Sequence, residues 1–101
     1  MRNLLSLIFS SASKRQDIAM DLLTTIRAKG KLSRLETVPV MNELAKKYNQ
    51  KYLNIRETFS KLCEFGLIEY NNSNYTLSTK PVAKFEQEWL EFLTTGEVKN
   101  E

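Results

Sequence analysis

The stretch IRETFSKLCEFGLIE, residues 55–69, decides the fold. Ile55, Phe59 and Leu62 recur at the spacing that places apolar side chains on one face of an α-helix. Gly66 follows as a helix terminator, because glycine adopts the left-handed conformation that closes a helix. The apolar residues directly after it have the composition of a β-strand. The stretch therefore predicts a helix that turns into a sheet at Gly66.

The same patterns predict the other elements on either side of this stretch. The predicted order is a helix at 14–29, an extended piece at 31–38, helices at 39–48 and 52–65, strands at 67–70 and 74–78, and a helix at 80–94. Ser13 and Gln16 match a capping box at the first helix, and Pro39 suits the first turn of the second. The apolar run 2–9 is too short for a secretory signal or a membrane span. We expect it to pack on the domain or on a partner chain.

Composition limits the chemistry that the chain can perform. It has 101 residues, enough for one small domain, with one cysteine and no histidine. An intrachain disulfide, an imidazole-based catalytic triad and nearly every zinc site are therefore excluded. We expect no enzyme activity, no catalytic residue, no metal site and no cofactor. The single cysteine, Cys63, is expected in the core of a cytoplasmic protein.

The charge is unevenly distributed along the chain. Residues 1–61 carry twelve Lys or Arg against five Asp or Glu, and residues 62–101 carry three against seven. The resulting net charge of +7 on the first portion favours a surface that faces a polyanion. Chance asymmetry in a small domain is the alternative interpretation.

The order of the predicted elements resembles that of a winged helix-turn-helix domain. Leu62, followed after three residues by Gly66-Leu67-Ile68, resembles the recognition helix and first wing strand of small prokaryotic regulators of the MarR-like and PadR-like families. The resemblance implies a mainly α fold with a small β-hairpin wing and with N- and C-terminal extensions. It divides the chain into an apolar extension (1–12), the winged helix-turn-helix domain (13–78), a C-terminal dimerisation helix (79–95) and a polar tail (96–101).

The resemblance also implies a DNA-binding surface on the helix at 52–65. Arginine can read guanine and asparagine can read adenine, so residues opposite the core face are candidate base readers. The base-reading candidates are Asn54, Arg56, Glu57 and Ser60, and the candidate contacts to the DNA backbone are Lys46, Lys47, Lys51, Lys61 and Arg34. For each lysine, a solvated surface charge is the alternative.

The predicted wing departs from the pattern of these families. Its tip consists of Asn71, Asn72, Ser73 and Asn74. It lacks the arginine or lysine that many winged-helix regulators insert into the minor groove. Contact of the asparagines with DNA and a plain polar turn are both open interpretations.

Aromatic residues have two interpretations in this chain. The last helix provides more apolar surface than a three-helix core absorbs, which predicts a homodimer with Phe85, Trp89, Phe92 and Leu93 in the interface. Completion of the monomer core is the alternative. The tyrosines at 48, 52, 70 and 75 permit stacking on single-stranded nucleic acid, but their positions favour packing in the core and across the strands.

Together these observations predict a double-stranded DNA-binding protein that acts as a dimeric transcriptional regulator. A plasmid or viral protein of partition or replication has the same fold and basic face, and it is a close alternative. The alternative from another class is a winged helix that binds a protein partner. The uncharged wing and the acidic Glu57 favour that alternative, whereas the charge distribution favours DNA.

Overall fold

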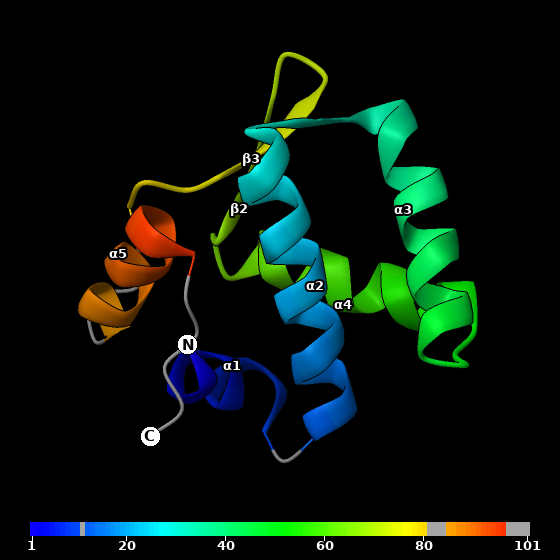
Figure 1. The fold of residues 1–101 in the computed structure, drawn as a ribbon, viewed down its shortest axis with the longest axis horizontal. Coiled ribbons are helices and arrows are strands. Elements are labelled where there is room, and N and C mark those ends of the chain that lie inside the picture. Colours follow the sequence, from blue (N-terminus) through cyan, green and yellow to red (C-terminus); the bar gives the residue numbers. More distant parts are fainter. Residues whose placement is uncertain (11, 81–84, 97–101) are drawn as a thin grey trace.

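The computed structural model describes residues 1–10, 12–80 and 85–96. In chain order the elements are α1 (Arg2–Phe9), α2 (Ser13–Lys29), β1 (Leu32–Ser33), α3 (Arg34–Lys47), α4 (Tyr52–Glu64), β2 (Ile68–Asn71), β3 (Asn74–Leu77) and α5 (Glu86–Thr95). The predicted fold class is confirmed, because the fold is mainly helical with a small antiparallel sheet (Figure 1). Helices α3 and α4 form the helix-turn-helix, the β2–β3 hairpin forms the wing, and α1 and α5 are the two extensions.

The wing belongs to a three-stranded antiparallel sheet with the strand order β1-β3-β2. Tyr75 of β3 is paired with Leu32 of β1 on one side and with Tyr70 of β2 on the other. The hairpin turn consists of Asn72 and Ser73, whose φ angles are 52° and 64°. Positive φ at both positions is the combination of a type I′ turn, whose twist matches that of the flanking strands. The short strand before α3 is thus joined directly to the wing.

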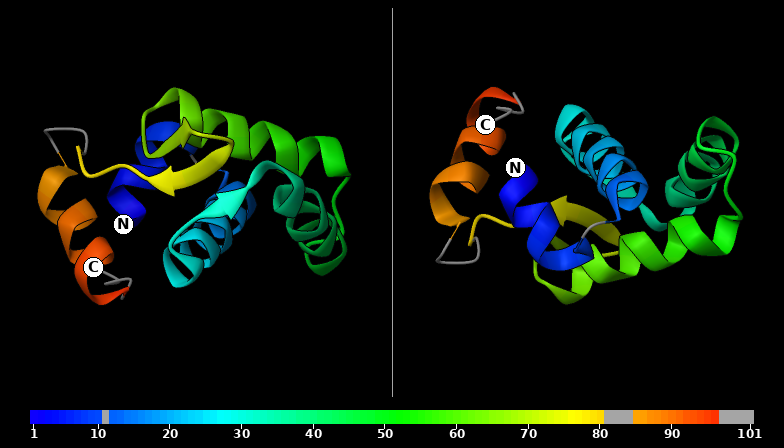
Figure 2. Two further views of the ribbon diagram at one scale, coloured as in Figure 1. Left: turned by 90° about the horizontal axis from the view of Figure 1, so that it is seen from above. Right: turned by 90° about the horizontal axis from the view of Figure 1, so that it is seen from below.

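Helix α2 lies at the centre of the fold. Its residues Ile18, Leu22 and Ile26 recur at helical spacing and are at most 1% exposed. Burial of an aliphatic side chain of this size contributes roughly 1.5–3 kcal/mol relative to exposure. Helix α4 runs across one side of α2 and α3 and buries Ile55 and Leu62 against them (Figure 2). The opposite side of α4 is left open.

The N-terminal apolar run forms α1 and packs on its own chain. Leu4 and Leu5 are fully buried. The amino group of Met1 pairs with the Glu88 carboxylate of α5 at 2.7 Å. Of the two arrangements expected for this run, the structure has the one in which it packs on the domain.

Helix α5 completes the core of the single chain at the end of the molecule opposite α3 (Figures 1 and 2). Trp89 and Phe92 are 0% exposed, and the Trp89 indole N–H donates to the Ser78 carbonyl at 2.7 Å. Arg27 of α2 donates to the carbonyl oxygens of Phe92 and Leu93 at 2.9 and 3.2 Å. The Phe92 carbonyl also accepts from the Gly96 N–H at 2.8 Å, and the Arg27 guanidinium places a cation at the negative end of the helix dipole.

This packing buries, within the single chain, residues that the sequence analysis assigned to a dimer interface. Trp89 and Phe92 have no exposed surface that a second copy could contact, and Phe85 and Leu93 are partly buried against the same core. The aromatic excess at the C-terminus is taken up within the chain because α1 enlarges the core that α5 covers.

Helix α3 begins at Arg34, so the predicted extended piece is wrong beyond Ser33 and the predicted helix start at Pro39 is wrong. Ser33 and Glu36 form a capping box, with the Glu36 N–H donating to the Ser33 hydroxyl at 3.2 Å. Pro39 lies inside the helix, where its lack of an N–H removes one backbone hydrogen bond. Hydrogen bonds from Ser33 hold the pKa of Glu36 below its ordinary value. The box therefore weakens as the pH falls through that lowered pKa.

Two other helix starts also differ from the prediction. The residue before α2 is Ala12, and the predicted capping box at Ser13 does not form, since the Gln16 amide donates to the Ser10 carbonyl at 2.8 Å. The last helix begins at Glu86, and residues 81–84 of the predicted helix lie outside the described residues. Helix α4 and both wing strands agree with the prediction to within one residue at each end.

Candidate nucleic-acid interface

Helix α4 presents an exposed ridge opposite its buried face. Ile55 and Leu62 point into the core, whereas Arg56, Ser60 and Lys61 are exposed. The two faces follow from the helical period of the sequence, and the apolar face fixes the rotation of the helix. The exposed side chains are therefore held on a rigid element and face outward.

Arg56 lies on this ridge without an acidic partner. Among the residues that the structure describes, its guanidinium makes no hydrogen bond and no ion pair. It borders two cavities, one of about 600 Å³ between α3, α4 and the sheet, and one of about 310 Å³ beside the start of α2. Ser60 borders both of them. An unpaired guanidinium between two hollows is accessible to an anionic partner.

The other two predicted base readers are already engaged by neighbours. The Asn54 amide is partly buried and donates to the Gln50 side-chain oxygen at 3.0 Å. The Glu57 carboxylate pairs with Arg15 of α2 at 3.1 Å. The pair partly neutralises the acidic residue that the sequence placed on the ridge. Of the four predicted base readers, Arg56 and Ser60 are the two without a side-chain partner in the described part of the chain.

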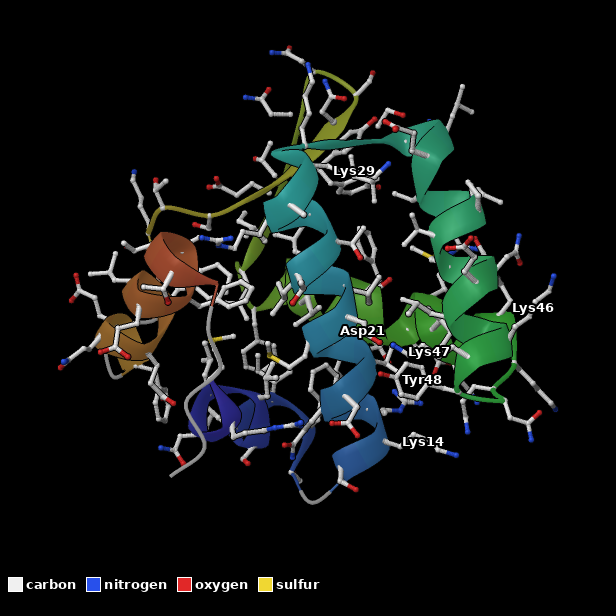
Figure 3. The ribbon with its side chains drawn as sticks, viewed as in Figure 1. Lys14, Asp21, Lys29, Lys46, Lys47 and Tyr48 are labelled. Carbon is white, nitrogen blue, oxygen red and sulfur yellow. The ribbon has the colours of Figure 1, made fainter. Side chains whose placement is uncertain are left out.

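The predicted backbone contacts separate into two groups. Arg34 borders the larger cavity together with Arg56, and Lys61 borders the smaller one. Lys46 and Lys51 are exposed but border neither cavity, and Figure 3 shows Lys46 extending away from the body of the protein. The sequence did not separate these groups, because which of these cations border a cavity depends on how α3, α4 and the sheet pack together.

Lys47 belongs to a local cluster on the side of α2. Its ammonium pairs with Asp21 at 2.9 Å, and the Tyr48 hydroxyl donates to the same carboxylate at 2.5 Å (Figure 3). Burial raises the pKa of the Tyr48 hydroxyl, and the nearby Asp21 charge raises it further. The Lys47 charge is thus partly compensated by Asp21, which makes it a weaker phosphate contact than the sequence suggested.

The tip of the wing lies against the start of α3. The Arg34 N–H donates to the Ser73 carbonyl at 3.1 Å, and the Asn74 amide donates to the Asn72 carbonyl at 3.2 Å. Asn71, at the end of β2, is exposed. A wing without its own cation therefore has an arginine of α3 directly beside its turn. The Ser-x-x-Glu motif at Ser33 signals that α3 starts at Arg34, whereas the pairing of β1 with β3 places that start beside the wing.

The structure also exposes apolar side chains that the sequence analysis did not single out. Leu35 and Val38 of α3 are 84% and 48% exposed, and Leu53 of α4 is 58% exposed. All three lie on the two helices of the helix-turn-helix. Val38 borders the larger cavity and Leu53 the smaller one. The surface around Arg56 is therefore a mixed one, in which cations alternate with apolar groups.

Cys63 is expected to be an unreactive thiol. It is partly buried on α4, and burial raises its pKa to about 11 from an ordinary value of 9.0. Because the thiolate is the reactive form, alkylation by iodoacetamide at pH 8 should be about 100-fold slower than for an unstructured cysteine peptide. The control is the same protein in urea, where the rate should rise to that of the peptide. A native rate equal to the peptide rate would contradict the burial.

Within residues 1–10, 12–80 and 85–96, no group of three His, Cys, Asp or Glu side chains is placed to hold a metal ion. No helix in this part of the chain combines the length and the apolar character needed to cross a membrane. Comparison with protein-family models, with curated proteins and with solved structures gives no match.

Proposed function

We propose that this protein binds double-stranded DNA as a transcriptional regulator, with α4 in the major groove. The observation that carries the proposal is the guanidinium of Arg56, which has no partner in residues 1–10, 12–80 and 85–96. It lies on the exposed ridge of α4, flanked by Ser60 and Lys61. An α-helix fits the major groove of B-DNA, and arginine is the side chain that most often reads guanine there.

Arg34 gives the proposal its second contact region. It is the first residue of α3 and is hydrogen-bonded through its backbone to the turn of the wing. In a winged helix with α4 in the major groove, the wing lies over the adjacent backbone. Arg34 then supplies the positive charge that the wing residues Asn72 and Ser73 lack, and it holds a phosphate without reading sequence.

A salt series with duplex DNA tests the proposal. The affinity is expected to fall linearly with salt on logarithmic axes, because each neutralised phosphate releases counterions with a slope of about −0.9. Roughly four to eight contacts per dimer give a total slope of about −4 to −7. Fluorescence anisotropy of a labelled duplex measures this slope. The salt concentration is varied between roughly 50 and 300 mM, where the salt dependence of the affinity is large. A flat response, or no binding at the lowest salt, would remove DNA as the partner.

The proposed assembly is a homodimer in the cytoplasm. Leu7 of α1 and Leu90 of α5 are 50% and 44% exposed, and exposed leucines on the terminal helices suit a symmetric interface away from α4. Two copies would present two α4 helices to half-sites about one DNA turn apart. The free thiol of Cys63 fits a reducing compartment. A plasmid or viral protein of partition or replication would use the same surface.

A protein partner is the second candidate, and the exposed apolar side chains favour it. Val38 and Leu53 border the two cavities beside Arg56, and Leu35 is exposed on α3. Clustered apolar groups on a surface are typical of protein interfaces. The salt series separates the two functions, because binding through apolar contacts has little salt dependence.

A further inference from the structure

The larger cavity beside α4 is lined by aromatic rings as well as by two arginines. It has a volume of about 600 Å³ and lies between α3, α4 and the sheet. Tyr52, Tyr70 and Tyr75 line it together with Arg34 and Arg56. Cavities of roughly 300–1,000 Å³ are typical of small-molecule sites in proteins. This hollow is therefore large enough for a single ligand of moderate size.

Both arginines of the cavity lack a counter-ion in the part of the chain that the structure describes. The ion pairs there join other residues, and neither guanidinium donates a hydrogen bond. Burial raises the pKa of the Tyr75 hydroxyl, while the charges of Arg34 and Arg56 oppose that rise, so both cations act on the same hydroxyl. Two guanidiniums that line one cavity and have no partner among the described residues favour a phosphate, whose oxygens accept hydrogen bonds from arginine in bidentate fashion.

The aromatic wall has a fixed part and an accessible part. Tyr75 is held between two rings, with its centroid 4.9 Å from that of Phe59 in an edge-on contact and 4.6 Å from that of Tyr70 in a tilted one. Tyr70 is 50% exposed. A half-exposed tyrosine braced by a second ring is a platform on which a planar group can stack.

We infer that the cavity between α3, α4 and the wing binds one nucleotide, with its phosphate at Arg34 and Arg56 and its base against Tyr70. The inference rests on the proposed function in that the two sites share Arg34 and Arg56. It extends that function to bases outside a duplex. The bases of B-DNA are stacked on one another, so the cavity admits only an unpaired base of a DNA strand or a free nucleotide.

Three probes distinguish the sources of the nucleotide. They are a blunt duplex, the same duplex with a three-nucleotide single-stranded overhang, and deoxyadenosine monophosphate, each titrated against the full chain. Stacking of one base on an aromatic platform is expected to make the overhang duplex bind roughly tenfold more tightly than the blunt one. A site for free nucleotides would instead bind the monophosphate, and inorganic phosphate should bind much more weakly than either.

Tyr70→Thr is the decisive variant, because threonine keeps the β-propensity of the strand while removing the ring. It should abolish the tighter binding of the overhang duplex, or the binding of the monophosphate. The affinity for the blunt duplex should stay within twofold of that of the unchanged protein. Arg34→Met should weaken all binding that uses the cavity, and Lys31→Met is its matched control, since Lys31 is an exposed cation that does not border the cavity. Circular dichroism confirms that each variant is folded.

The outcomes separate this inference from the proposed function. Equal affinity for blunt and overhang duplexes, with no binding of the monophosphate, overturns the inference and leaves duplex binding intact. If the Tyr70→Thr variant still binds the overhang duplex more tightly than the blunt duplex, the inference is also overturned. Binding of the monophosphate without any binding of the duplex overturns the proposed function and supports the inference.

Discussion

Replacing Trp89 with alanine is expected to lower the free energy of unfolding by about 3–5 kcal/mol, the range typical of a large aromatic side chain removed from a core. Trp89 is 0% exposed and packs on Phe92, so its loss leaves a cavity in the region where α5 covers the rest of the chain. It also leaves the Ser78 carbonyl without its donor. Urea denaturation followed by circular dichroism measures the change.

The control for this variant is Gln87→Ala. Gln87 lies on the same helix and is exposed, so its truncation should change the stability by about 0.5 kcal/mol or less. Light scattering on both variants tests whether the last helix completes the core of the single chain or forms an interface between two copies. If Trp89→Ala dissociated a dimer while the unfolding transition stayed in place, Trp89 would be an interface residue after all.

The second large effect is expected from Arg56→Ala on a DNA site selected for tight binding. Loss of a bidentate contact to guanine should weaken that complex by about 1–3 kcal/mol, and the effect on a scrambled duplex should be much smaller. Arg56 has no partner in the described part of the chain, so its removal leaves no unpaired group behind and does not disturb α4. Anisotropy titrations on both duplexes measure the difference.

Lys46→Ala is the comparison for Arg56→Ala. Lys46 is exposed at the end of α3. Its replacement is therefore expected to weaken the binding of all DNA sequences about equally and to reduce the salt dependence of the affinity. If Arg56→Ala lowered both affinities by the same factor, α4 would not read bases through that residue. The protein would then be a non-specific DNA binder and not a regulator of particular sites.

The elements that the sequence predicted well are those whose signal is local. Helix α4 has a strict apolar period and a glycine at its end, and its bounds differ from the prediction by a single residue. The start of α3 was placed wrongly because Pro39 was interpreted as a first-turn residue, although Ser33 and Glu36 form a capping box upstream of it. The similar motif at Ser13 forms no box, and the Gln16 amide donates to the Ser10 carbonyl instead.

The parts of the candidate site that were missed depend on contacts between distant residues. The pairing of β1 with β3 brings Arg34 to the wing, and no local pattern encodes that pairing. The engagement of Glu57 by Arg15 depends in the same way on how α2 crosses α4. The burial of Trp89 could not be separated from a dimer interface by composition, because both remove the same apolar surface from water.

The bonds between Arg27 and the end of α5 also bear on how the chain folds as it is made. They join residues 65 to 67 positions apart, and contacts of such sequence separation are slow to form because the entropy of closing the loop must be overcome first. During synthesis α2 leaves the ribosome long before Trp89 and Phe92, so one side of its apolar surface stays open. A nascent chain that stalls before α5 would therefore expose that surface to aggregation or to a chaperone.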